Sequence, residues 1–99
     1  MTGLRHVVTF VFVDDATDEQ IAAVTEALET LPGLIPEIRD YRVGRDAGIN
    51  EGNQQYAVVA DFENVDDYLV YRDHPAHLAV IAERIRPILG SRAAVQFHI

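Results

Sequence analysis

The side chains with the widest potential for acid–base chemistry in this 99-residue chain are its four histidines and four tyrosines. Three of them lie together in the segment YRDHPAH, where Tyr71, His74 and His77 surround a proline. Near neutral pH an imidazole can accept or donate a proton, and a phenol can donate a hydrogen bond to an oxyanion. The segment is therefore a candidate catalytic site, a candidate metal site or simply the start of a helix.

His77 is the candidate general base of this segment. Pro75 is well suited to the first position of a helix, which makes His74 the N-cap and His77 the third helical residue. The positive end of the helix dipole disfavours an imidazolium, so the ring is expected to stay neutral and able to accept a proton. The alternative is that His77 satisfies backbone donors at the helix start or packs as a half-buried ring.

Tyr71 is the candidate oxyanion donor. It precedes His77 by six residues, a spacing that does not fall on one face of a straight helix. However, a residue before proline is pushed out of the helical region, so the chain is expected to turn at His74. Tyr71 and His77 can then point into one cavity between the helices and the sheet. The alternative is that Tyr71 is a core aromatic residue.

The same histidines leave a metal site open as an alternative. His74 and His77 have an H-x-x-H spacing, His6 can supply a third ligand if the first strand lies beneath this turn, and Asp73 is the only adjacent carboxylate. That set is incomplete, so we expect no metal and no other cofactor. The chain has no cysteine, which excludes thiolate chemistry and disulfides.

The elements that would position these residues follow the order β-α-β-β-α-β. The sequence predicts strands over 4–12, 38–46, 55–62 and 93–99, a helix capped by Thr17 and ended at Pro32-Gly33, a helix capped by Asn64, and a further helix from Pro75 that Pro87 ends or kinks. This order predicts a single α+β domain over residues 1–99 with a ferredoxin-like, four-stranded antiparallel sheet and helices on one face.

The first strand predicts both a pocket and a partner. His6, Val8 and Phe10 share the face expected to look toward the helices, and they would line a small site for an apolar ligand. The opposite face, with Val7 and Val11, is apolar too, although no helix is left to cover it. We therefore expect a homodimer in which two copies pack sheet to sheet.

Charge and composition exclude several function classes. The net charge is −8 and all eight basic residues are scattered arginines, so a nucleic-acid or anionic-membrane surface is not expected. Apolar residues form 48% of the chain, with no run of the roughly 18 residues that a membrane span needs. The N-terminal residues start a strand pattern rather than a signal peptide, and we expect a cytoplasmic protein.

Four segments resemble a known family. RHVVTFVF, LPGLIPEIRDYRVGRD, YAVVADFENVDDYLVYRDHPAH and AAVQFHI together resemble the stress-responsive A/B barrel (Dabb) domain family. The most specific parts are the F-x-[NS]-x-x-D helix entry and the Y-x-x-H-P-x-H run. The resemblance covers nearly the whole chain and implies a ferredoxin-like protomer that forms a dimeric α/β barrel.

The resemblance also implies site residues. A plant polyketide cyclase related to the family forms olivetolic acid, and its catalytic tyrosine and histidine correspond to Tyr71 and His77 here. A histidine on the first strand corresponds to His6. A further pocket histidine falls at or near Tyr56, where this sequence departs from the cyclase, and that departure argues against the same substrate. We also expect Tyr56 and His74 to contact the substrate.

Two functions remain open at this point. The first is a cofactor-independent, polyketide cyclase-like or isomerase-like enzyme for an apolar carbonyl compound, in which His77 is the base, Tyr71 holds the oxyanion and His6 orients the substrate. The second is a non-catalytic dimeric barrel that binds a ligand or acts in a stress response. A metal-dependent oxygen enzyme is the third and least supported reading.

Overall fold

The structure is a computed structural model that describes residues 3–99. Its strands are β1 (Leu4–Phe12), β2 (Asp40–Arg45), β3 (Tyr56–Phe62) and β4 (Leu89–His98). Its helices are α1 (Asp18–Glu29), the short α2 (Leu31–Leu34), α3 (Val65–Asp73) and α4 (Pro75–Val80), and α4 continues as a π-helical turn, η1 (Ile81–Ile85), and a 3-10 turn, η2 (Arg86–Ile88).

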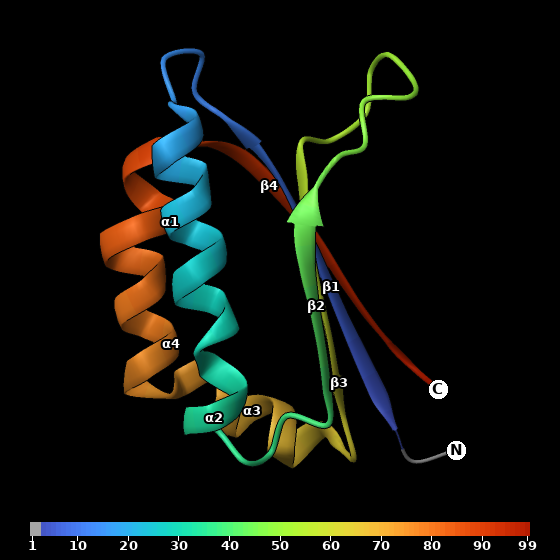
Figure 1. Cartoon of the computed structure of the whole chain (residues 1–99). Helices are drawn as coiled ribbons and strands as arrows, with labels where there is room; N and C mark the ends of the chain where they lie inside the picture. The colour runs from blue at the N-terminus through green and yellow to red at the C-terminus, as the bar shows by residue number, and fades with distance from the viewer. Residues whose placement is uncertain (1–2) are drawn as a thin grey trace.

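The four strands form one antiparallel sheet in the order β2-β3-β1-β4. In Figure 1 the helices form a single layer on one face of this sheet, with α1 and α4 side by side and α3 at one end. This is the ferredoxin-like arrangement that the sequence predicted. The two ends of the described chain lie close together at one end of the neighbouring strands β1 and β4 (Figure 1).

The predicted helix starts are confirmed by their hydrogen bonds. Thr17 and Gln20 form a reciprocal capping box at the start of α1. Asn64 accepts from the backbone of Asp67 at the start of α3, and His74 Nδ1 accepts from the backbone of Ala76 at the start of α4. The helical path therefore breaks at His74, as the following proline predicted.

Several boundaries differ from the prediction. Helix α1 ends at Glu29, and Pro32 lies near the start of α2 rather than ending α1, because a proline is tolerated in a first helical turn. Strand β2 starts at Asp40, two residues late. Strand β4 starts at Leu89, four residues early, because Leu89 and Ser91 already pair with β1 across an irregularity at Val11 and Phe12.

The core lies between the helices and the helix-facing side of β1 and β3. Alternate residues of these two strands are buried over their whole length, as a sheet with a period of two requires. Strand β4 differs, because nearly all of its residues are exposed on both faces. No helix among the described residues is long and apolar enough to cross a membrane.

Candidate active site

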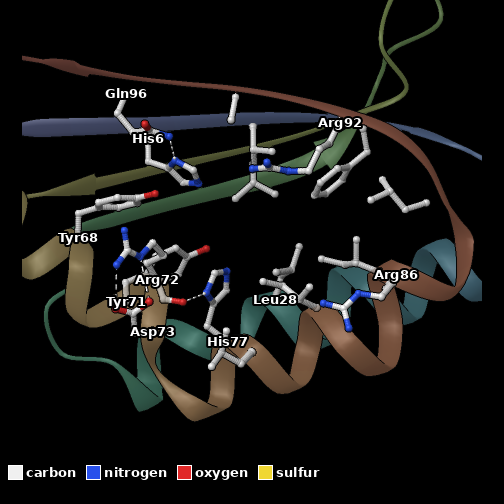
Figure 2. A pocket seen from close by; sticks show the side chains of 18 residues that line it. His6, Leu28, Tyr68, Tyr71, Arg72, Asp73, His77, Arg86, Arg92 and Gln96 are labelled. Carbon is white, nitrogen blue, oxygen red and sulfur yellow. Dashed lines mark hydrogen bonds and ion pairs between the residues drawn. The ribbon is translucent and has the colours of Figure 1, made fainter.

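A cavity of about 650 Å3 lies between the sheet and the segment α3–α4, where β4 has no helix packed against it. Figure 2 shows it with strands forming one wall and helices the other. The lining side chains that bear on chemistry are His6, Tyr68, Tyr71, Arg72, Asp73, His77, Arg86, Arg92 and Gln96. The apolar ones are Val8, Phe10, Leu28, Val58, Leu78, Ile81, Ile85, Leu89 and Ala94.

His77 reaches the cavity from the first turn of α4. Its Nδ1 lies 3.0 Å from the backbone carbonyl oxygen of Arg72. A carbonyl can only accept, so Nδ1 carries the proton and Nε2 keeps a free lone pair. Figure 2 shows this bond crossing the break between α3 and α4. The helix junction therefore fixes the imidazole as the tautomer that a general base needs.

The electrostatic setting of His77 keeps its ring neutral. Burial lowers the pKa of His77, and the bond to the Arg72 carbonyl offsets part of that effect. The direction agrees with the expectation from the helix position, but the largest cause is burial rather than the helix dipole. At pH 7 the Nε2 lone pair is available to accept a proton.

His6 lies in the cavity with the opposite tautomer. Gln96 on β4 donates through Nε2 to His6 Nδ1 at 2.8 Å, which leaves the proton on His6 Nε2. Burial, together with the charges of His77 and Arg92, lowers the pKa of His6 to about 4. His6 is thus a neutral hydrogen-bond donor, whereas His77 is a neutral acceptor.

Tyr71 lies between the two histidines. Its ring stacks on His77 with centroids 4.1 Å apart and lies 6.1 Å from His6. The side chain is only 1% exposed, and its hydroxyl is 2.9 Å from that of Tyr41. Burial raises the pKa of Tyr71 to about 12, so the phenol stays protonated and can donate.

Tyr68 is a cavity residue that the sequence reasoning did not select. Its ring lies 5.1 Å from that of His6, and Figure 2 shows its hydroxyl directed into the cavity. Within residues 3–99, the hydroxyls of Tyr41, Tyr56 and Tyr71 have hydrogen-bond partners and that of Tyr68 has none. The spacing of three between Tyr68 and Tyr71, which places both on one helix face, was the available signal.

Gln96 and Arg92 were missed as well. They lie opposite His6 and Phe10 in the register between β4 and β1, so their side chains share the helix-facing side. A strand pattern identifies which residues alternate, but it does not give the register against a neighbour that is about 90 residues away in sequence.

Not every predicted residue reaches the cavity. His6, Val8, Phe10, Tyr71 and His77 line it together. Two others, Tyr56 and His74, do not line it. The Tyr56 side chain is 1% exposed, packs against Phe10 and Phe12, and forms a 2.6 Å hydrogen bond with Thr25. His74 is the N-cap of α4.

The described part of the chain does not have the ligand geometry that the alternative of a metal site needs. Between residues 3 and 99, no three histidine, aspartate or glutamate side chains cluster in a way that could hold a metal ion. The first histidine of the H-x-x-H run is used as a helix cap, so the run does not form one ligand face.

Comparison with known families is decisive for the class of protein. The family model described as the Stress Responsive A/B Barrel Domain, Dabb, matches residues 4–99. The chain belongs to the Dabb family. This membership confirms the resemblance noted in the sequence. None of the curated proteins compared with the chain matches it.

Solved structures agree with the Dabb assignment. A dimeric ferredoxin-like protein of unknown function from Thermobifida fusca is 43% identical over 98% of this chain and 91% of its own, with a TM-score of 0.91. A similar dimeric protein from Bacteroides fragilis is 32% identical over 98% and 96%, with a TM-score of 0.82. A hydroxynitrile lyase from Passiflora edulis shares the fold at 20% identity over 99% and 94%, with a TM-score of 0.86.

Proposed function

We propose that this Dabb protein is a cofactor-independent enzyme that moves a proton next to a carbonyl group of a largely apolar substrate. His77 Nε2 removes the proton, and the negative charge that develops on the carbonyl oxygen is held by neutral donors. Cyclisation of a poly-β-keto chain or isomerisation of an enolisable ketone are the reactions of this type that the arrangement supports best.

The observation that carries the proposal is the pair of opposite histidine tautomers. The Arg72 carbonyl commits His77 to accept at Nε2, and the Gln96 amide commits His6 to donate at Nε2. Both rings line one cavity and both have a lowered pKa. A neutral base and a neutral donor in one cavity suit enolisation, because the proton and the oxyanion are then handled by separate groups.

Two tyrosines complete the donor set. The Tyr68 hydroxyl faces the cavity without a protein partner between residues 3 and 99. The Tyr71 hydroxyl, paired with that of Tyr41, donates to the substrate oxygen when Tyr41 donates to it. Since burial raises the pKa of Tyr71, the phenol keeps its proton throughout the working pH range. We place the oxyanion among His6, Tyr68 and Tyr71.

A second candidate function is a non-catalytic barrel that binds an apolar ligand. It is favoured by the environment of Tyr71, which is 1% exposed and already bonded to Tyr41, as a structural tyrosine would be. In that case the cavity holds a ligand through its apolar lining and the histidines only orient it.

We further propose that the working form is a homodimer packed through the open face of the sheet. Val95 and Phe97 are 55% and 45% exposed on that face, beside the half-buried Val7 and Val59. Contiguous apolar side chains of this kind mark an interaction surface. The Thermobifida fusca and Bacteroides fragilis neighbours are described as dimeric, which supports a second copy as the partner.

The test of catalysis is turnover of linear poly-β-keto thioesters, followed by chromatography of the substrate and the cyclised product. We expect wild type to accelerate cyclisation and His77→Ala to lose at least about 100-fold, the lower range for a general base. His98→Gln, outside the cavity lining, serves as the matched histidine control and should keep full activity. Equal rates for wild type and His77→Ala would remove His77 from the mechanism, and ligand binding without turnover would favour the second candidate.

A further inference from the structure

The charged residues of the cavity are unbalanced. Four charged side chains line it, namely Arg72, Asp73, Arg86 and Arg92. Arg72 binds Asp73 through two hydrogen bonds of 2.9 and 3.0 Å, so these two charges neutralise each other. Arg86 and Arg92 form no ion pair with any residue in the described range 3–99. The cavity therefore carries two uncompensated positive charges.

This imbalance runs against the charge of the chain as a whole. The sequence has sixteen acidic residues for eight arginines, and its net charge is −8. Of the five arginines outside this cavity, Arg5, Arg42 and Arg45 each pair with a carboxylate, whereas Arg39 and Arg84 form no ion pair within the described residues 3–99. Yet among residues 3–99 the only carboxylate that lines the cavity is that of Asp73, which Arg72 already binds. The cavity lining therefore offers guanidinium groups to a bound ligand.

The two arginines reach the cavity from opposite walls. Arg92 extends from β4 on the strand wall, and Arg86 extends from the last helical turn on the other wall (Figure 2). Apolar side chains such as Leu28, Ile85 and Leu89 also line the cavity. A ligand that satisfies this lining needs an apolar body and an anionic group that can contact guanidinium donors.

We propose that Arg86 and Arg92 form a carboxylate receptor, and that the natural ligand of this cavity is an apolar oxo-carboxylic acid whose carboxylate they bind. A guanidinium matches a carboxylate with paired N–H donors, and such charge-assisted bonds are stronger than those between neutral groups. The bound carboxylate fixes one end of the chain, so that the oxo group is presented to His77 and His6. The inference rests on the proposed function for the position of the reacting carbonyl, but the receptor itself is tested by binding alone.

The experiment compares octanoate, octanamide and octyl phosphate by isothermal titration calorimetry with the 99-residue protein. The first two probes share an apolar chain and differ in charge, while the third distinguishes a phosphate site. We expect wild type to bind octanoate at least tenfold more tightly than octanamide. Arg86→Gln and Arg92→Gln should each weaken octanoate binding severalfold, and the double variant should bind the two probes equally.

Arg84→Gln is the matched control, because it removes the same charge as Arg86→Gln. Arg84 precedes Arg86 by two residues and lies outside the cavity lining. It should bind octanoate as wild type does. The proposal is overturned if octanamide binds wild type as tightly as octanoate, if Arg84→Gln weakens binding as much as Arg86→Gln, or if octyl phosphate binds more than tenfold better than octanoate.

His77→Gln separates this inference from the proposed enzyme activity. The variant should retain the preference for octanoate, because His77 takes no part in the receptor. If the protein prefers octanoate but shows no turnover, the receptor proposal is supported and the catalytic proposal is refuted. If the protein turns over its substrate but binds octanoate and octanamide equally, the catalytic proposal is supported and the receptor proposal is refuted. Circular dichroism of each variant confirms that loss of binding is not loss of folding.

Discussion

The imidazole of His77 lies stacked on the phenol ring of Tyr71, with 4.1 Å between centroids and 28° between ring planes. The two residues belong to different helices, α3 and α4, and the break at His74 brings them together. The tyrosine ring therefore supports one side of the imidazole while the Arg72 carbonyl holds its Nδ1. Ring position and tautomer are fixed by separate neighbours.

The first prediction separates these roles of Tyr71. Tyr71→Phe keeps the stacked ring and loses only the hydroxyl bond to Tyr41, so it should lower the free energy of unfolding by about 1 kcal/mol. Tyr71→Ala removes a fully buried ring and should lower it by about 3–5 kcal/mol. Urea denaturation measures both values. Equal losses in the two variants would show that the ring contributes nothing beyond its hydroxyl.

The second prediction concerns the protonation of the two cavity histidines. Burial lowers both pKa values, so NMR titration should place the midpoint of His6 at about 4 and that of His77 below 6.5. Because the base must be unprotonated, kcat/KM should rise with pH through the His77 midpoint and stay level at neutral pH. Observed midpoints of 6.5 or above for both rings would contradict the buried, neutral pair.

The same shift has a consequence for stability. Between pH 4 and 6.5 the unfolded chain binds a proton at His6 that the folded protein does not, so the free energy of unfolding should fall as the pH drops through this window. His6→Asn removes this group, and its free energy of unfolding should depend less steeply on pH over the same window. Parallel pH profiles for the two proteins, measured by urea denaturation, would argue that the His6 ring is solvated.

The third prediction concerns self-association. A charge at the centre of an apolar interface is strongly unfavourable, so Val95→Asp and Phe97→Asp should shift the dimer toward monomer in sedimentation equilibrium. Ile49→Asp is the control, because Ile49 is an 83% exposed apolar residue in the β2–β3 connection, away from the sheet face. A wild-type protein that sediments as a monomer at micromolar concentration would refute the dimer.

The fourth prediction concerns the irregular pairing at the start of β4. A Cβ built on Gly90 would lie 3.0 Å from the Val11 carbonyl oxygen and 3.2 Å from Phe12 backbone atoms, which cannot move away as a side chain can. Gly90→Ala should lower the free energy of unfolding by about 1–3 kcal/mol, the usual cost of overpacking. A Cβ built on Gly33 would have no atom of a non-adjacent part of the described chain within 4 Å, so Gly33→Ala should leave the free energy of unfolding unchanged or raise it slightly.

The sequence predicted the fold well where the signals are local. The capping residues Thr17 and Asn64, the helix start at Pro75 and the alternation of β1 depend on neighbours within a few positions, and each of these predictions was confirmed. The end of α1 was misplaced because Pro32 fits the first turn of another helix as readily as it stops one.

The candidate site was less predictable because it depends on contacts that are distant in sequence. His6 and His77 have chemistry that attracts attention in any sequence, but Gln96 acquires its role only through the pairing of β4 with β1. Arg92 likewise faces the cavity because β4 lies at the sheet edge with no helix over it. The absence of a covering element is a property of the assembled fold, and no local pattern encodes it.

Strand β4 combines two tasks through the alternation of its side chains. Arg92, Ala94 and Gln96 face the cavity, while Val95 and Phe97 face the open side where we place the partner. Neither set belongs to the buried core, so substitutions of these five residues can change ligand preference or partner affinity at little cost to folding, unlike a substitution of Gly90. A one-residue insertion after Gly90 would exchange the two sets at once. The length of this edge strand is therefore tightly constrained, because the number of its residues decides which side chains reach the cavity and which reach the open face.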